Sequence, residues 1–279
     1  MTTLTTSIHT QFRTIDGLSI RYAESEPRQE HAILLCPWPE SLFAYARMWE
    51  QLANDVHLVA LDLPGFGHSE RRDDLLSPRA MGEFLVRLAD AFGLDRPHAV
   101  GPDVGTAALL FAAASHPQQF RSLVVGTGAT SYPLELGEPL LGWVESPDLD
   151  AYRKIDPRQF VGAAIGKITP TYSLPESIRE DYLSAYAGDR FVESMRYVRT
   201  YPAELPILAD LLPTIQTPVQ IIAGASDTAI PPSNAEFLHA RLPKSKLDII
   251  DAGHFAWEDN PDTYASIVSS WGSEGYHRA

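Results

Sequence analysis

The chain has 279 residues, and its 36 acidic against 22 basic side chains give a formal net charge of -14. Because no Lys/Arg cluster could follow a phosphate backbone, we expect no nucleic-acid partner. This length fits one large α/β domain or a domain with an insertion, and the 44% hydrophobic content is enough for a sizeable core. The single cysteine, Cys36, excludes an intrachain disulfide and a Cys-based zinc site. With no leader pattern and no run of membrane-spanning length, we expect a cytoplasmic protein without a membrane partner.

Short apolar runs alternate with helical patterns over the first 130 residues. An Asp16-Gly17 pair between two β-prone runs predicts a hairpin over residues 7–23. Apolar strands are then predicted at residues 31–35, 56–62, 97–100 and 122–125, and helices at 43–52, 77–92 and 106–115. This alternation predicts βαβ units, and therefore an α/β fold with a mostly parallel sheet and helices on both faces.

The alternation lapses over residues 131–213, which are rich in Pro, Tyr, Asp and Glu. Helix-like pieces at residues 150–152, 157–168, 175–186 and 191–200, without a clear strand, predict a helical insertion that covers the site. The sheet pattern resumes with strands at 218–223 and 247–250 and helices at 233–242 and 261–271. We therefore expect a core in two parts, residues 1–130 and 214–279, around the insertion at 131–213.

The stretch Val100-Gly101-Pro102-Asp103-Val104-Gly105 has the pattern of a nucleophile elbow. In this sharp strand-to-helix turn, small neighbours let the central side chain project above the sheet. An aspartate in that place is ionised at neutral pH and can displace a leaving group from a saturated carbon, which leaves an ester on the enzyme. The elbow therefore favours alkyl transfer to Asp103 over ester hydrolysis. The alternative is an ordinary glycine-rich turn with a surface aspartate.

Two further polar residues follow predicted strands after the insertion. Asp227 comes after the strand at 218–223, and His254 comes after the strand at 247–250. The order nucleophile, acid, histidine is that of a catalytic triad built at strand ends. Because the carboxyl ends of parallel strands share one edge of the sheet, we expect Asp103, Asp227 and His254 to meet there.

With these residues the chain resembles the α/β-hydrolase superfamily along nearly its whole length. The Asp nucleophile is similar to that of the epoxide hydrolase and dehalogenase branches, and two stretches look like family signatures: Leu63-Pro64-Gly65-Phe66-Gly67-His68-Ser69 and Gly253-His254-Phe255. The resemblance implies that Asp103 is the nucleophile, His254 the base for water and Asp227 the residue that orients His254. It also implies that the insertion is a cap domain.

The sequence departs from the family pattern at two places near the expected oxyanion hole. Cys36-Pro37-Trp38-Pro39 stands where members usually have His-Gly-x-Pro. The backbone N–H groups of Trp38 and Val104 remain as the expected oxyanion donors. Val104 stands where haloalkane dehalogenases and many epoxide hydrolases carry Trp and where fluoroacetate-type dehalogenases carry Arg. Without that indole to hold a halide and without that Arg to hold a substrate carboxylate, the resemblance counts against a dehalogenase.

Epoxide opening needs a proton donor for the leaving alkoxide, and the resemblance implies that cap tyrosines supply it. By its place late in the cap, Tyr197 is the first candidate, and Tyr152 is the second. For both residues the alternative is packing with the hydroxyl at the surface. That packing role is also expected of the remaining cap tyrosines: Tyr132, Tyr172, Tyr182, Tyr186 and Tyr201.

The sequence thus predicts an epoxide hydrolase that forms a vicinal diol through an ester on Asp103, which water activated by His254 then hydrolyses. We expect no cofactor and no metal, and a small apolar or amphipathic organic substrate. One alternative is a dehalogenase that uses the same ester. Another is a non-hydrolytic binding or pathway protein on the same fold, in which Pro37 has spoiled the oxyanion hole.

Overall fold

A computed structural model describes residues 8–168 and 173–273. One eight-stranded sheet runs through it in the order β1-β2-β4-β3-β5-β6-β7-β8. The strands are β1 (Thr10–Ile15), β2 (Leu18–Glu24), β3 (Glu30–Leu35), β4 (Val56–Leu61), β5 (His98–Pro102), β6 (Ser122–Gly126), β7 (Val219–Gly224) and β8 (Ser245–Ile250). The pairs β1–β2 and β2–β4 are antiparallel and every other pair is parallel, which confirms the predicted hairpin and the mostly parallel sheet.

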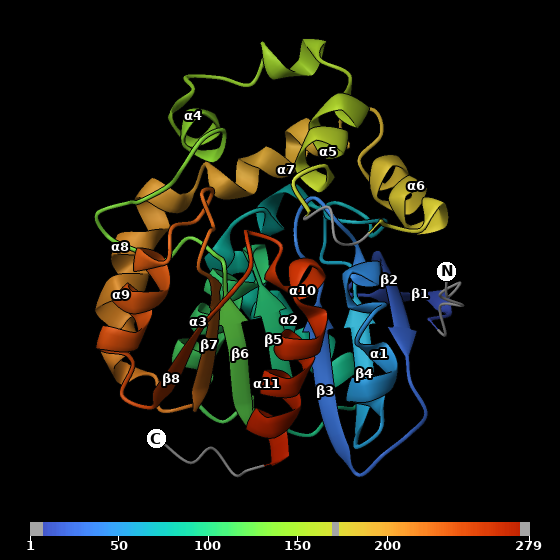
Figure 1. Cartoon of the computed structure of the whole chain (residues 1–279), viewed down its shortest axis with the longest axis vertical. Coiled ribbons are helices and arrows are strands. Elements are labelled where there is room, and N and C mark those ends of the chain that lie inside the picture. Colours follow the sequence, from blue (N-terminus) through green and yellow to red (C-terminus); the bar gives the residue numbers. More distant parts are fainter. Residues whose placement is uncertain (1–7, 169–172, 274–279) are drawn as a thin grey trace.

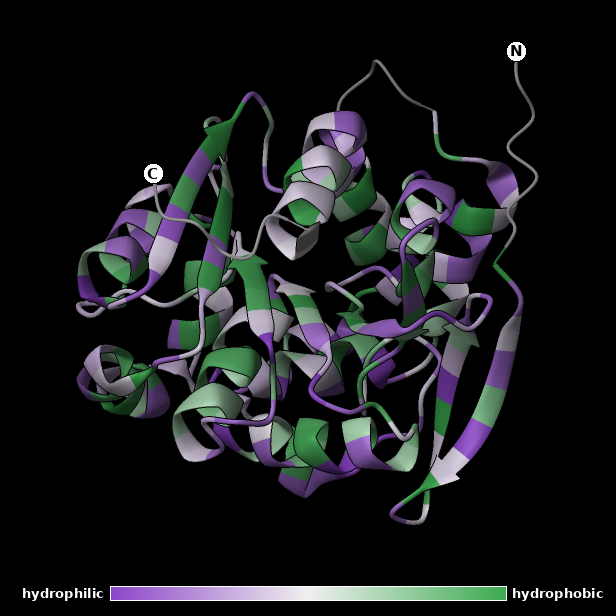
Figure 2. Cartoon of the chain, turned by 90° about the horizontal axis from the view of Figure 1, so that it is seen from below, coloured by the Kyte–Doolittle hydropathy of each residue, from purple (hydrophilic) through white to green (hydrophobic). Residues whose placement is uncertain are grey.

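Helices cover both faces of the sheet, as Figures 1 and 2 show. The core helices are α1 (Trp49–Ala53), α2 (Pro78–Ala91), α3 (Val104–Ser115), α9 (Ser233–Arg241), α10 (Ala256–Asp259) and α11 (Pro261–Ser273), with 3-10 turns η1 (Leu42–Tyr45), η2 (Asp73–Leu75) and η4 (Leu212–Thr214). Helix α2 begins where Ser77 Oγ accepts a hydrogen bond from the N–H of Ala80, and it buries Met81 and Phe84. Helix α3 is buried over most of its length, because it lies between the sheet and α2.

The predicted helix at residues 43–52 is wrong, because this stretch splits into η1 and α1. Contacts with the sheet fix the break. The N–H of Leu42 donates to Asp62 Oδ1 at 2.7 Å, and the Tyr45 hydroxyl donates to the carbonyl of Leu35. These tertiary bonds set the backbone direction here, so apolar spacing alone could not predict it.

Between β6 and β7 the described residues form helices and no strand. The elements are α4 (Leu140–Glu145), η3 (Tyr152–Lys154), α5 (Pro157–Ile165), α6 (Glu176–Ala185), α7 (Arg190–Val198) and α8 (Tyr201–Leu211). Figure 1 shows α4 to α7 above the end of the sheet where β5 and β7 finish. The sequence patterns missed α4 and α8, the latter because Pro206 lies inside the helix. Helix α8 also packs on α3, and the boundaries at residues 131 and 213 stay a prediction.

A buried ion pair joins this helical region to the sheet. Arg21 of β2 donates to both carboxylate oxygens of Asp181 in α6, at 2.7 and 3.1 Å, and Ser41 Oγ donates to the same carboxylate at 2.6 Å. Burial by itself would raise the pKa of Asp181. Hydrogen bonds from His68 and Arg21 outweigh it and lower the pKa to about 2. The folded state therefore favours the ionised carboxylate.

No helix in the described part of the chain is both long and apolar enough to cross a bilayer.

Replacing Asp181 should loosen the attachment of the helical region. We expect Asp181→Asn to lower the free energy of unfolding at pH 7 by about 1–3 kcal/mol, as for other hydrogen bonds to charged groups. The folded pKa is depressed from about 3.9, so the wild-type advantage is complete above that value and is lost as the pH falls toward 2. Urea unfolding from pH 7 down to pH 3 measures both effects.

Asp189→Asn is the matched control, because the Asp189 side chain is 62% exposed beside Arg71. It should change the unfolding free energy by less than about 0.5 kcal/mol. Equal stability of Asp181→Asn and the wild type at pH 7 would show that the Arg21 pair does not hold the region.

Candidate active site

Asp103 lies between β5 and α3 with φ 52° and ψ -121°, a conformation that costs a non-glycine residue energy. Surrounding contacts enforce it. A Cβ atom on Gly101 would lie 2.6 Å from Leu109 Cδ1, and a Cβ atom on Gly128 would lie 2.4 Å from the carbonyl oxygen of Asp103. The N–H of Asp103 donates to the carbonyl of Gly126 at 2.9 Å. The turn therefore has the geometry of a nucleophile elbow.

Two backbone N–H groups hold the Asp103 carboxylate. The N–H of Trp38 donates to Oδ2 at 2.6 Å, and the N–H of Val104 also donates to the side chain. Both are the groups that the sequence indicates as oxyanion donors. The Cys36-Pro37-Trp38-Pro39 loop thus aims a donor at the nucleophile although it departs from the family pattern.

His254 and Asp227 complete the constellation. His254 Nδ1 lies 2.9 Å from Asp227 Oδ2, and Asp227 Oδ1 accepts the N–H groups of Ala229 and Ile230, at 2.9 Å each. His254 Nε2 lies 3.9 Å from Asp103 Oδ1, which is too long for a hydrogen bond. The structure therefore brings Asp103, Asp227 and His254 together, with one nitrogen of the imidazole directed at the elbow.

Burial and charge shift the pKa values of the two reactive groups. Burial raises the pKa of Asp103 to about 6, against the opposing effects of His254 and the two N–H donors. Burial would lower the pKa of His254, but the charge and hydrogen bond of Asp227, together with the charge of Asp103, raise it. Asp103 is therefore mainly ionised at neutral pH.

A cavity of about 250 Å³ opens above the elbow. Its lining includes the charged or polar side chains of Asp103, His254, Lys167 and Tyr201, and apolar groups supplied by Trp38, Leu140, Trp143, Phe160, Val198 and Phe255. A space of this size, with few polar groups, suits a small organic molecule. A second hollow of about 340 Å³ lies at the amino ends of β3, β5 and β6, away from the triad. In the described part of the chain, no group of three His, Cys, Asp or Glu side chains could hold a metal ion.

The family model of the alpha/beta hydrolase fold matches residues 32–261. The chain belongs to the α/β-hydrolase family. One similar protein is the 2-hydroxy-6-oxononadienedioate/2-hydroxy-6-oxononatrienedioate hydrolase 2 of Pseudomonas putida. It is 30% identical over 232 residues, which cover 78% of this chain and 77% of that protein.

Two solved structures show the same fold. Cfl2 from Burkholderia cenocepacia has a TM-score of 0.83 and 21% identity, with 97% of each chain covered. Est816, described as an N-acyl homoserine lactone degrading enzyme, has a TM-score of 0.73 and 20% identity, with 94% of this chain and 100% of that one covered. At these identities the likeness extends to the α/β-hydrolase fold alone.

The two tyrosines favoured by the sequence do not direct their hydroxyls to the cavity. Tyr197 is fully buried in α7, and its hydroxyl donates to the carbonyl of Val104 at 2.7 Å. The Tyr152 hydroxyl points to the carbonyl of Gly142 at 3.5 Å, and neither residue lines the cavity. This is a correction to the predicted proton donors. The physical reason is that each hydroxyl has a backbone acceptor elsewhere.

A different tyrosine lines the cavity: Tyr201, at the first position of α8. The sequence predicts only a packing role for this residue. The two rings are neighbours across the break between α7 and α8, edge to face with centroids 6.1 Å apart, so the separation of four residues from Tyr197 was the available signal. Tyr172 lies outside the described residues.

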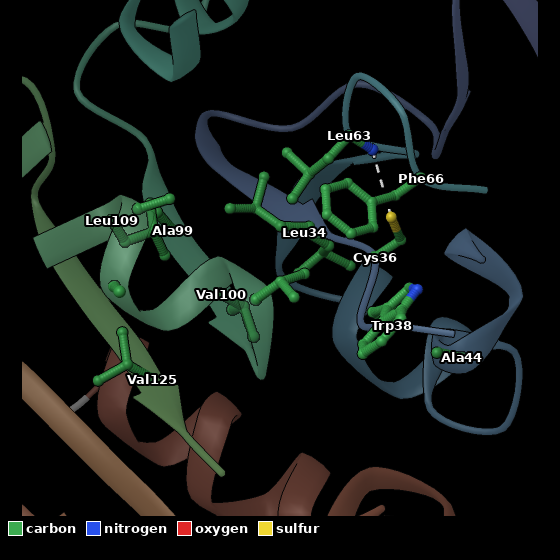
Figure 3. Close-up of a cluster of buried hydrophobic side chains, with 14 of the residues drawn as sticks. Leu34, Cys36, Trp38, Ala44, Leu63, Phe66, Ala99, Val100, Leu109 and Val125 are labelled. Atoms are coloured by element: carbon green, nitrogen blue, oxygen red, sulfur yellow. Dashed lines mark hydrogen bonds between the residues drawn. The ribbon is translucent and has the colours of Figure 1, made fainter. Parts of the chain in front are cut away.

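Cys36 has the structural role expected of a buried thiol. Figure 3 shows its sulfur directed toward Leu63 and Phe66, and the N–H of Leu63 donates to Sγ at 3.2 Å. Burial raises the pKa of this thiol well above its ordinary value, so it is not a second nucleophile beside Asp103.

A side-chain atom at Gly128 should displace the backbone of Asp103 in the elbow. We expect Gly128→Ala to cost about 1–3 kcal/mol of stability, because the new Cβ would overlap the carbonyl of Asp103. Thermal and urea unfolding measure the loss. Gly162→Ala in α5 is the control: its Cβ would meet Leu183 at an ordinary 3.9 Å, so the added helix propensity should stabilise the chain by up to about 1 kcal/mol. A Gly128→Ala protein as stable as the wild type would contradict this account of the elbow.

Proposed function

We propose that the protein hydrolyses an epoxide to a vicinal diol through a covalent ester on Asp103. The observation that carries the proposal is the carboxylate in the elbow, with Oδ2 held by the N–H of Trp38 and Oδ1 facing His254. A carboxylate attacks a saturated carbon and needs no base to activate it. On an acyl group it would form a mixed anhydride, so this nucleophile favours alkyl transfer over the hydrolysis of esters.

In the first step, a carboxylate oxygen of Asp103 forms a bond to a ring carbon, and the carbon–oxygen bond of the epoxide breaks. The electrons of that bond pass to the leaving oxygen, which takes a proton from a donor in the cavity. Tyr201 supplies this donor. Burial, and then the charge of Asp103, raise the pKa of Tyr201 well above its ordinary value, so its hydroxyl keeps its proton until an alkoxide develops.

In the second step, water adds to the carboxyl carbon of the ester while His254 takes a proton from it. The N–H groups of Trp38 and Val104 stabilise the tetrahedral oxyanion, which then collapses and releases the diol as His254 returns the proton. The regenerated Asp103 carboxyl gives its proton back to the Tyr201 phenolate left by the first step, which restores both groups. Before the ester forms, the negative charge of Asp103 helps to raise the pKa of His254. Ester formation removes that charge, so the imidazole loses protons more readily when a base is required.

The comparisons support the hydrolase class, since the Pseudomonas putida relative is named a hydrolase. The choice of an epoxide rests on Asp103 and on a cavity tyrosine. A haloalkane would form the same ester without a proton donor, because a halide leaves as a stable anion.

Changing His254 should trap the ester. With 1,2-epoxyhexane or styrene oxide, His254→Gln should still become alkylated and then stall, because the base acts after ester formation. Mass spectrometry should find an increase equal to the mass of the epoxide, located on Asp103. Asp103→Ala is the control and should show no adduct. Turnover by His254→Gln at the wild-type rate would remove His254 from the mechanism, and halide release from haloalkanes without epoxide turnover would identify a dehalogenase.

Removing the cavity hydroxyl should slow the first step. We expect Tyr201→Phe to reduce the rate of Asp103 alkylation by roughly 10²–10⁴-fold, the usual contribution of a positioned acid, and to leave ester hydrolysis nearly unchanged. Rapid-quench measurements in single turnovers separate the two steps.

Tyr197→Phe is the matched control. It removes a hydroxyl that donates to the carbonyl of Val104, so it should cost about 1 kcal/mol of stability and change alkylation by a few-fold at most. Alkylation at full speed by Tyr201→Phe, or a larger loss in Tyr197→Phe, would contradict the assignment of Tyr201.

A further inference from the structure

Besides His254, the described part of the cavity lining has one basic side chain, that of the exposed Lys167. Lys167 follows α5, and its side chain forms part of the same wall as Asp103 and His254. Several arginines of the helical region pair with carboxylates, such as Arg153 with Glu193 and Arg158 with Glu180. Within the described residues, no carboxylate pairs with Lys167. Its ammonium group is therefore available to a ligand.

The positive charge of Lys167 acts on His254, at the end of the cavity where the reaction takes place. It opposes the effects of Asp227 and Asp103 on His254 and acts to lower the pKa of that imidazole. The neighbouring wall is apolar, with Phe160 and Ala163 from the preceding helix. The cavity thus combines a reactive carboxylate, an apolar wall and one separate cation.

We infer that the substrate is an epoxide that carries a carboxylate at the end of a short apolar chain, with the carboxylate bound by Lys167. This inference rests on the proposed function. The protein has a net charge of -14, which repels anions, so an anionic substrate needs a local cation. A single ammonium matches a monoanion. A phosphate group would leave excess negative charge near Asp103, which must itself stay ionised.

The binding test uses hexanoate and hexanamide, which have the same carbon skeleton and differ in charge. By calorimetry or ligand-observed NMR, Lys167→Met should weaken hexanoate binding by about tenfold and change hexanamide binding by less than twofold. Added salt should weaken hexanoate binding to the wild type. Lys154→Met is the control, because Lys154 is exposed in the same region and does not line the cavity. It should bind both ligands as the wild type does.

The turnover test compares 5,6-epoxyhexanoate with 5,6-epoxyhexanamide. The wild type should favour the acid in kcat/KM, and Lys167→Met should reduce that preference by about tenfold. Unchanged hexanoate binding in Lys167→Met, or an equal loss in Lys154→Met, overturns the role of Lys167 whether or not epoxides react. If hexanoate binds through Lys167 but neither epoxide alkylates Asp103, the proposed function fails and the anion site stands.

Discussion

The positive φ of Asp103 is the constraint on which the site depends. An aspartate in this conformation is strained, and it persists because its backbone is fixed by neighbours on both sides. The side chain of Thr106 bonds to the carbonyls of Gly101 and Gly126, so the end of β5, the start of α3 and the end of β6 are held together. Gly128 then passes too close to the Asp103 carbonyl for any larger residue. The strained turn places a carboxylate at the entrance to α3, where Trp38 and Val104 can hold it.

The electrostatics of the site follow from burying that carboxylate. Removal from water raises the pKa of Asp103 to about 6, and the N–H donors and His254 limit the rise. The charges of Asp103 and Asp227 both favour the protonated imidazole, so the pKa of His254 depends on both carboxylates. Alkylation of Asp103 would cancel one of these charges. The same event that consumes the nucleophile therefore prepares the base for the next step.

The helical region contributes to the site through backbone contacts as well as through its cavity wall. Tyr186 donates to the carbonyl of Glu40 at 2.9 Å, next to the loop that carries Trp38, and Tyr197 donates to the carbonyl of Val104. Both oxyanion donors thus lie within two residues of a tyrosine anchor. Together with the pair between Arg21 and Asp181, these bonds hold α6 and α7 over the elbow. Movement of these helices should therefore affect the reacting groups directly.

Local sequence patterns were enough to predict the sheet, the elbow and the order of Asp103, Asp227 and His254. Strand–helix alternation and glycine spacing are local properties, and parallel strands necessarily end at one edge. The sequence also indicated Trp38 and Val104, because their donors belong to the backbone and need no particular side-chain direction. Sequence patterns could not predict the division of residues 43–53 into η1 and α1, because that break depends on hydrogen bonds to Asp62 and to the carbonyl of Leu35.

Which side chains of the helical region reach the cavity depends on tertiary packing. Tyr197 and Tyr201 are both tyrosines and lie four positions apart. The Tyr197 hydroxyl donates to the carbonyl of Val104, whereas the Tyr201 side chain lines the cavity. That difference arises where α7 ends and α8 begins: α7 reaches the start of α3 through the Tyr197 hydroxyl, whereas α8 packs on α3. The position of Lys167 and the raised pKa of Asp103 have the same origin. The burial of a side chain and the charges around it depend on residues far apart in the chain, so local sequence patterns cannot predict them.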